Sequence, residues 1–151
     1  ILGGLWRGEA FTFHGQHYHV EAMTLLPPTV QQPRIPVWVV GAWQRPRSLA
    51  RALRWDGILP AKLAPPGTSG DLTPADIQEI HDLISHQRSG DAPFAIVIEG
   101  RTPGDDPAQA QAKLRPFAEA GATWWMETLW GEPADLAGVR TRILQGPPRQ
   151  A

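Results

Sequence analysis

The chain has 151 residues, which is enough for one ordinary domain with a buried core, and 42% of them are hydrophobic. Its formal net charge of −1 argues against nucleic acid as a partner, and no apolar run approaches the ~20 residues that would argue for a membrane. Cysteine is absent, which excludes disulfides, cysteine-ligated zinc and thiol catalysis, and we expect a cytoplasmic protein.

Residues 1–35 are expected to form an irregular excursion that precedes the regular part of the fold. Their first segment, ILGGLW, is typical of the last turn of a helix, so we expect the chain to be a fragment or a truncated product. Aromatic and apolar residues then flank a turn at His14–Gly15, which predicts a small hairpin.

Three histidines in this excursion, His14, His17 and His19, raise the question of a metal site, since histidine is the commonest metal ligand. In the predicted hairpin His17 and His19 share one face, with no carboxylate or cysteine close by. We therefore predict no metal site here, and keep a metal-dependent enzyme as the third of three hypotheses.

The segment 36–60 predicts the first βαβ unit. Pro36–Gly41 is a continuous apolar run, as in a parallel strand that is covered on both faces. A helix over 46–54 begins with Pro46 in its first turn. Its apolar face is predicted to hold Leu49, Ala52 and Leu53, and its solvated face Arg47, Arg51 and Arg54.

Three further strand–helix units are predicted after the first. The strands are expected at 57–60, 94–99 and 122–128, and the helices at about 73–90, 106–121 and 134–145. Thr73-Pro74 followed by Asp76 is a good helix start. Adjacent Trp124 and Trp125 must point to opposite faces of their strand, and core packing is the simpler role for both, as for Trp38.

Regular alternation of strands and helices over residues 36–151 predicts the α/β class with a parallel sheet. No Gly-x-Gly-x-x-Gly follows the first strand, so the dinucleotide fingerprint of a doubly wound fold is missing. Four such units make half of a (β/α)8 barrel, whose active sites lie where the strands end. The residues found there are Trp43, Lys62, Glu99 and Glu127.

Four segments in this order resemble the bacterial-luciferase-like, flavin-dependent oxidoreductases: FTFHGQHYHV, LLPPTVQQPRIPVWVVGAW, RALRWDGILP and AGATWWMET. The resemblance runs from Leu5 to about Arg149. It implies the C-terminal half of a (β/α)8 barrel, roughly strands five to eight. It also implies FMN or a deazaflavin coenzyme and a small organic substrate. The parent enzyme would be a monooxygenase or oxidoreductase, and this half of its barrel is expected to be incomplete as a catalyst alone.

The turn after the first strand is the best candidate for cofactor binding. Gly41 and Ala42 let a ligand approach the backbone, Trp43 follows them, and a helix start near Ser48 offers free N–H groups to a phosphate. Arg45 and Arg47 add positive charge. The resemblance implies that the phosphate end or the ring of the flavin lies near this turn. The competing interpretation is a plain tight connection with solvated arginines.

Glu99 and Glu127 are the candidates for catalysis, because each ends a strand at the predicted mouth and a carboxylate there is able to transfer a proton. The competing interpretation is structural. In that case each carboxylate caps a neighbouring helix or pairs with Arg101 or Lys62.

A half-barrel leaves two edge strands and one sheet face uncovered, which promotes pairing or aggregation. We therefore expect a homo-oligomer, namely a self-paired dimer, or else a poorly behaved monomer. The leading hypothesis is an oxidoreductase half-barrel. The second hypothesis is a non-catalytic half-barrel that self-associates or binds a partner.

Overall fold

The computed structural model describes residues 1–65, 70–90, 92–129 and 135–148. Their contacts divide the chain into two compact units, Ile1–Val37 and Trp38–Ala151.

The first unit contains the predicted hairpin. A short helix, α1 (Leu2–Leu5), precedes two antiparallel strands, β1 (Phe11–His14) and β2 (His19–Met23). The turn between them closes with a hydrogen bond from Gly15 N to Tyr18 O at 2.9 Å. His14 lies opposite His19, with ring centroids 5.6 Å apart, while His17 lies in the turn. The predicted pairing of His17 with His19 on one strand face is therefore wrong, because the turn is longer than His14–Gly15.

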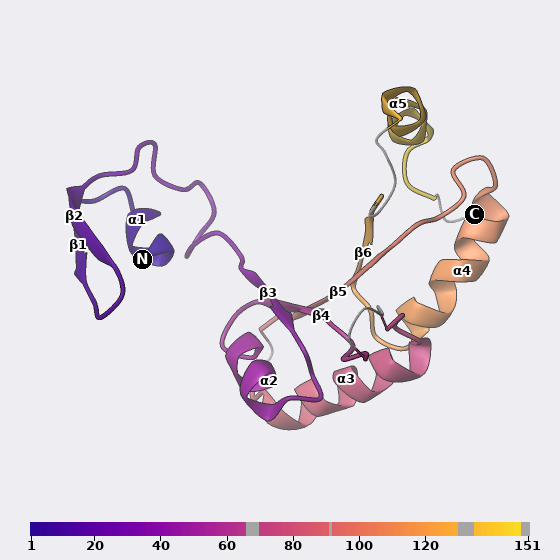
Figure 1. The fold of residues 1–151 in the computed structure, drawn as a ribbon, viewed down its shortest axis with the longest axis horizontal. Coiled ribbons are helices and arrows are strands. Elements are labelled where there is room, and N and C mark those ends of the chain that lie inside the picture. The colour runs from indigo at the N-terminus through magenta and orange to yellow at the C-terminus, as the bar shows by residue number, and fades with distance from the viewer. Residues whose placement is uncertain (66–69, 91, 130–134, 149–151) are drawn as a thin grey trace. The chain divides into compact units, whose positions relative to one another are not determined.

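The second unit alternates strands and helices along the chain (Figure 1). Its strands pair in parallel in the order β3-β4-β5-β6. This confirms the predicted α/β class, and the four strands are half the number in a (β/α)8 barrel. The elements are β3 (Trp38–Gly41), α2 (Pro46–Ala52), β4 (Gly57–Pro60), α3 (Pro74–Gln87), β5 (Ala95–Gly100), α4 (Pro107–Glu119), β6 (Trp124–Glu127) and α5 (Leu136–Gln145).

Most predicted boundaries move by one to three residues. Helix α2 ends at Ala52, and the chain leaves it through i to i−3 hydrogen bonds from Arg54 N to Arg51 O and from Trp55 N to Ala52 O. Helix α3 ends at Gln87, before Gly90, because Arg88 adopts an extended backbone. The guanidinium of Arg88 donates to the carbonyl oxygens of Leu53 and Trp55, at 2.9 and 3.2 Å. These contacts tie the end of α3 to the segment after α2. The predicted start of the last helix at residue 134 lies outside the described residues.

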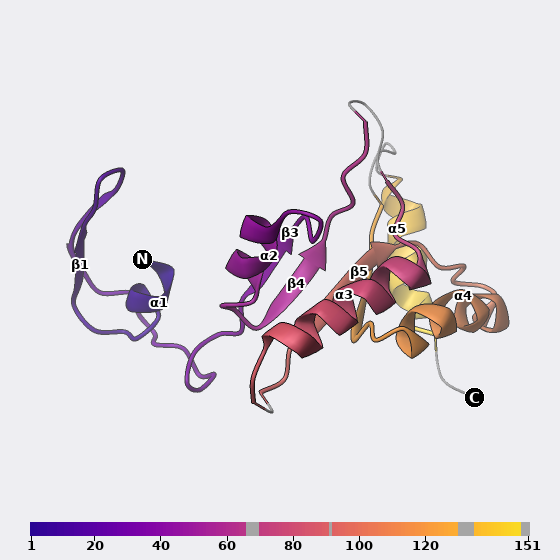
Figure 2. The same ribbon diagram turned by 90° about the horizontal axis from the view of Figure 1, so that it is seen from below.

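Helices α2, α3 and α4 cover one face of the sheet (Figure 2). Alternate residues of the strands meet them there, and Ile58, Ile77 and Ile80 are fully buried. Leu49 and Ala52 of α2 join this core, as predicted, and Trp125 of β6 packs against it. Burial of the apolar stripe of each helix is what attaches it to the sheet.

The opposite face, which we call the open face, carries Trp38, Val40, Glu99, Trp124 and Met126. Its apolar side chains remain 38% (Trp38), 60% (Val40), 57% (Trp124) and 37% (Met126) exposed. The prediction that the first strand is covered on both faces is therefore wrong within the described part of the chain. The core role predicted for Trp38 and Trp124 is wrong for the same reason, whereas Trp125 does pack against the core.

The two tryptophans of the open face contact each other across the sheet. Their ring centroids lie 5.3 Å apart although Trp38 belongs to β3 and Trp124 to β6. Gly57 makes this possible, since a Cβ at that position would lie 2.7 Å from Cδ1 of Trp38. Val97 of β5 lies in register with Trp124 and is 1% exposed. Trp38 leans into the space that glycine leaves.

The start of α3 has the predicted cap. Thr73 Oγ1 accepts a hydrogen bond from Asp76 N, and Asp76 Oδ2 accepts one from Thr73 N at 2.8 Å, which together form a capping box. Lys62 Nζ lies 2.8 Å from the same Oδ2. Burial raises the pKa of Asp76, but the hydrogen bonds from Lys62 and Thr73 outweigh it and hold the pKa below its usual value.

We expect Asp76→Asn to destabilise the protein by about 1 kcal/mol, the usual worth of such a cap. Because the pKa of Asp76 is lower in the folded state, its contribution is complete above the unfolded pKa and is lost as the pH falls through the folded pKa. In thermal unfolding, the melting temperatures of the variant and the parent should differ at neutral pH and converge at acidic pH. Glu79→Gln on the exposed face of α3 is the control, and an equal loss there would contradict the assignment.

Candidate functional site

The turn after β3 is held together by packing inside the unit. Gly41 is buried, and a Cβ added to it would lie 3.2 Å from Cδ1 of Ile58 on the helix-covered face. A larger residue here would have to displace the Ile58 side chain by a few tenths of an ångström. Ser48 Oγ accepts a hydrogen bond from Ala42 N at 3.1 Å, which joins the first turn of α2 to the end of β3.

Among the candidates in this turn, the structure separates core residues from surface residues. Trp43 is 3% exposed and belongs to the core, and its Nε1 finds no hydrogen-bond partner among the described residues. Arg45 and Arg47 are exposed at the start of α2. The arginines are thus the side chains of this turn that are free to meet a ligand.

Arg51 does more than the solvated role that the sequence predicted for it. Its Nη2 donates to the carbonyl oxygen of Val40 at 2.9 Å. The neighbouring carbonyl of Gly41 accepts from Ala61 N, on the side of β4. Carbonyl directions alternate along a strand, so Arg51 covers an oxygen on the outer edge of β3. Helical spacing placed Arg51 outward but held no signal for this contact.

Glu127 is bound on the helix-covered side of the sheet. Its Oε1 accepts from Thr102 N at 2.6 Å, and its Oε2 accepts from Thr102 Oγ1 at 2.8 Å. Arg142 Nη2 from α5 lies 3.3 Å from Oε2, and Trp125 Nε1 donates to the same oxygen at 3.3 Å. Burial raises the pKa of Glu127, but the bonds from Thr102 and the charge of Arg142 outweigh it and lower the pKa.

Glu127 therefore has partners, but they differ from Arg101 and Lys62, the ones the sequence suggested. Arg142 comes from the last helix and also donates to Thr102 Oγ1 at 2.8 Å and to Gly146 O at 2.7 Å. A mainly apolar cleft of about 610 Å³ lies beside this network, between β6, α4 and α5. It lies on the side of the sheet that carries Trp125 and Glu127.

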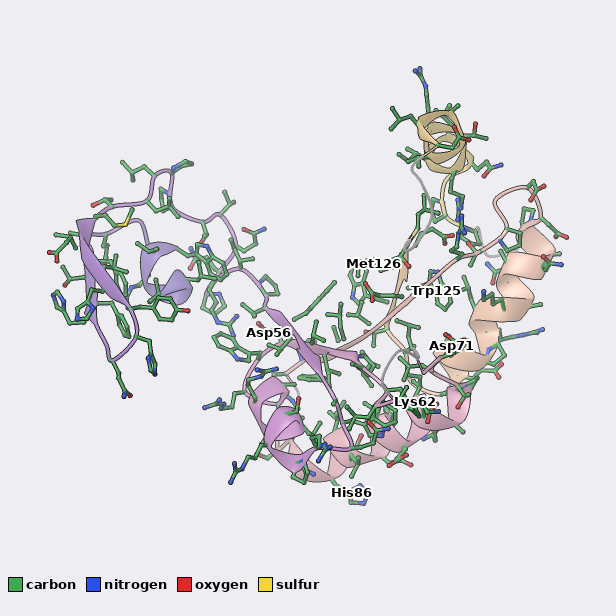
Figure 3. The ribbon with its side chains drawn as sticks, viewed as in Figure 1. Asp56, Lys62, Asp71, His86, Trp125 and Met126 are labelled. Carbon is green, nitrogen blue, oxygen red and sulfur yellow. The ribbon has the colours of Figure 1, made fainter. Side chains whose placement is uncertain are left out.

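Glu99 lies on the other side of the sheet. In the register of β5 and β6, Glu99 faces Met126, and Gly100 faces Glu127. Successive residues of a strand point to opposite faces, so the two carboxylates do not come together. Figure 3 shows the same alternation at Trp125 and Met126. Glu99 is exposed, and no hydrogen bond or ion pair of its side chain occurs within the described residues.

Lys62, the remaining polar residue at the predicted mouth, is labelled in Figure 3. Its Nζ is held by Asp76 near the start of α3. Within the described ranges no group of three or more histidine or acidic side chains could hold a metal ion. No described helix is long and apolar enough to cross a membrane.

A parallel four-stranded sheet with helices on one face and polar side chains where the strands end defines a half-barrel of the (β/α)8 type. The luciferase-like monooxygenase family model matches residues 1–146, and the chain belongs to this family. No match to the chain is found among curated proteins. The match confirms the resemblance to this family, whose members are oxidoreductases that generally use flavin-type cofactors.

Proposed function

We propose that the chain is part of a flavin- or deazaflavin-dependent oxidoreductase that acts on a small organic substrate. The match to the luciferase-like monooxygenases over 1–146 is the observation that carries this proposal. The cofactor is FMN or a deazaflavin coenzyme. Whichever is used, the cofactor supplies the redox chemistry when bound, and the protein binds, orients and shields it.

The charges of the turn after β3 fit a cofactor that bears a phosphate. Arg45 and Arg47 are both exposed where β3 leads into α2, and guanidinium groups pair well with phosphate oxygens. Gly41, Ala42 and Ser48 shape the turn through the contacts described above, and Trp43 supports it from the core. We assign the two arginines to phosphate binding and the other four residues to support of the turn.

Of the two carboxylates, Glu99 is the better candidate for a role at the substrate. It is exposed on the open face beside Met126, whereas both oxygens of Glu127 already accept hydrogen bonds. A group that donates or accepts a proton must reach the reacting atom within hydrogen-bond distance. Glu99 is accessible to a ligand on the open face, whereas we assign Glu127 to a structural ion pair with Arg142.

A titration with FMN, followed by tryptophan fluorescence, tests the proposal. We expect saturable quenching, because Trp43 lies in the turn after β3, next to the two arginines in the sequence. Arg47→Gln should weaken binding by roughly tenfold, the equivalent of one lost charge-assisted bond. Arg54→Gln is the matched control, since Arg54 is an exposed arginine beyond the end of α2.

Saturable quenching with equal affinity for both variants would contradict the assignment of Arg47. Absence of quenching with FMN and with a deazaflavin coenzyme would contradict cofactor binding by this chain. That result would favour the second candidate function, a half-barrel that self-associates without catalysis. The observation behind this alternative is the exposed apolar open face.

A further inference from the structure

The hairpin of the first unit brings together two histidines that the sequence did not predict to be neighbours. His14 ends β1 and His19 begins β2, and the two residues lie directly opposite each other in the register of the strands. The prediction of no metal site assumed that His17 and His19 share one face of the hairpin. Because that assumption is wrong, the pair of imidazoles that is able to share a ligand is His14 and His19.

The backbone of the turn holds this pair at close range. Gly15 N donates to Tyr18 O at 2.9 Å, which makes Gly15 and Tyr18 a hydrogen-bonded pair. Hydrogen-bonded and non-hydrogen-bonded pairs alternate along antiparallel strands, so the next pair, His14 and His19, is of the second kind. Side chains approach each other more closely in such a pair. The spacing of the two imidazoles is therefore fixed by the hairpin itself.

The distance between the two rings suits a shared metal ion. A metal–nitrogen bond of about 2.0–2.1 Å places the ion about 3.2 Å from the centre of each imidazole, so two rings on one tetrahedral ion have centres about 5.2 Å apart. The ring centroids of His14 and His19 lie 5.6 Å apart and the ring planes are tilted by 53°. The ring torsion of histidine is broad, so a nitrogen of each ring is able to turn toward a common point.

Both imidazoles are available to an ion from solution. His14 and His19 are exposed. Among the residues that the structure describes, neither imidazole has a hydrogen bond or an ion pair that would occupy its nitrogens.

We propose that His14 and His19 together bind one divalent transition-metal ion, such as Zn²⁺ or Cu²⁺, for which imidazole is a suitable ligand. Water fills the other coordination positions, since the described ranges hold no larger group of histidine or acidic side chains that could bind a metal. Structural zinc sites have four protein ligands and catalytic ones have three. With two, this site is an exchangeable cross-link between strands, and it does not depend on the proposed oxidoreductase function.

The hairpin is a part of the chain where such a cross-link has a large effect. Strands β1 and β2 form a sheet of only two strands, and a hairpin of this kind is marginally stable by itself. An ion that binds the paired strands and not the separated ones stabilises the pairing by mass action. We therefore expect the ion to order the hairpin beside its turn.

The first test is calorimetric titration of the full chain with ZnCl₂. We expect saturable binding of one ion per chain. His14→Gln and, independently, His19→Gln should each weaken binding by roughly tenfold or more, because even the residues that only support a metal ligand are typically worth 10–100-fold. His17→Gln is the matched control, since His17 is an exposed histidine in the turn of the same hairpin, and it should leave the affinity unchanged.

The second test counts the ligands and separates metal binding from folding. With Cu²⁺, electron paramagnetic resonance should show two nitrogen ligands in the parent and one in His14→Gln or His19→Gln. Circular dichroism of these variants without metal should match that of the parent, because glutamine is accommodated at an exposed strand position.

Absence of saturable binding with both Zn²⁺ and Cu²⁺ would overturn the proposal. So would binding that survives His14→Gln and His19→Gln, or that His17→Gln weakens as much as they do, since either result places the ion elsewhere. Failure of the FMN titration would leave the proposal intact, because that titration reports on the turn after β3.

Discussion

Replacing Ile58 with alanine is expected to lower the free energy of unfolding by about 2–5 kcal/mol. Ile58 is fully buried in the middle of β4, and its Cδ1 reaches the position where Gly41 lacks a side chain. Removal of three heavy atoms leaves a cavity between the sheet and its helices, which relaxation fills only in part. Domains of this size are stable by only about 5–15 kcal/mol, so the loss is a large fraction of the total.

Urea unfolding followed by far-ultraviolet circular dichroism measures this effect. Ile143→Ala is a matched control, because it removes the same atoms from a side chain that is 72% exposed on α5. We expect the control to change the unfolding free energy by less than about 0.5 kcal/mol. Equal losses at the two positions would contradict the assignment of the core to the helix-covered face.

Replacing Glu127 with alanine is expected to cost about 1–3 kcal/mol. The substitution leaves Thr102, which is 6% exposed, and Arg142 without their carboxylate partner. Leaving a buried donor without an acceptor costs more free energy than the intact hydrogen bond contributes to stability. The arginine, which is itself largely buried, makes this loss greater than that of a surface pair.

The same carboxylate predicts a dependence of stability on pH. The pKa of Glu127 is lower in the folded than in the unfolded state, so its contribution is complete above the unfolded pKa, near 4.5. It is lost as the pH falls through the folded pKa. When unfolding is measured over this acidic range, the Glu127→Gln variant should lose less stability than the parent as the pH falls. Glu119→Gln, on an exposed position of α4, should follow the parent.

The two glutamates differ in the partners that they meet on the two faces of one sheet. Glu127 and Glu99 end neighbouring strands, but the first is bound to Thr102 and Arg142 and the second meets no described partner. Acidification below the usual range of a carboxylate should therefore weaken the fold through Glu127.

Local patterns in the sequence determined the repeating architecture. Alternating apolar strands and amphipathic helices predicted the parallel sheet, and β4 begins and ends where expected. Thr73, Pro74 and Asp76 predicted the start of α3, because a cap depends on residues within one turn of each other. Adjacent Trp124 and Trp125 had to face opposite ways, since side chains alternate along any strand. The family was also evident from ordered sequence segments.

Only the tertiary structure decided which of the two strand faces is covered and which is open. Alternation defines two sets of residues but does not say which set meets the helices, and this choice separates Glu99 from Glu127 and Trp124 from Trp125. The sequence also did not predict contacts between distant residues, such as Trp38 with Trp124 and Glu127 with Arg142. Such pairs form because packing brings separate elements together, and no spacing along the chain records them.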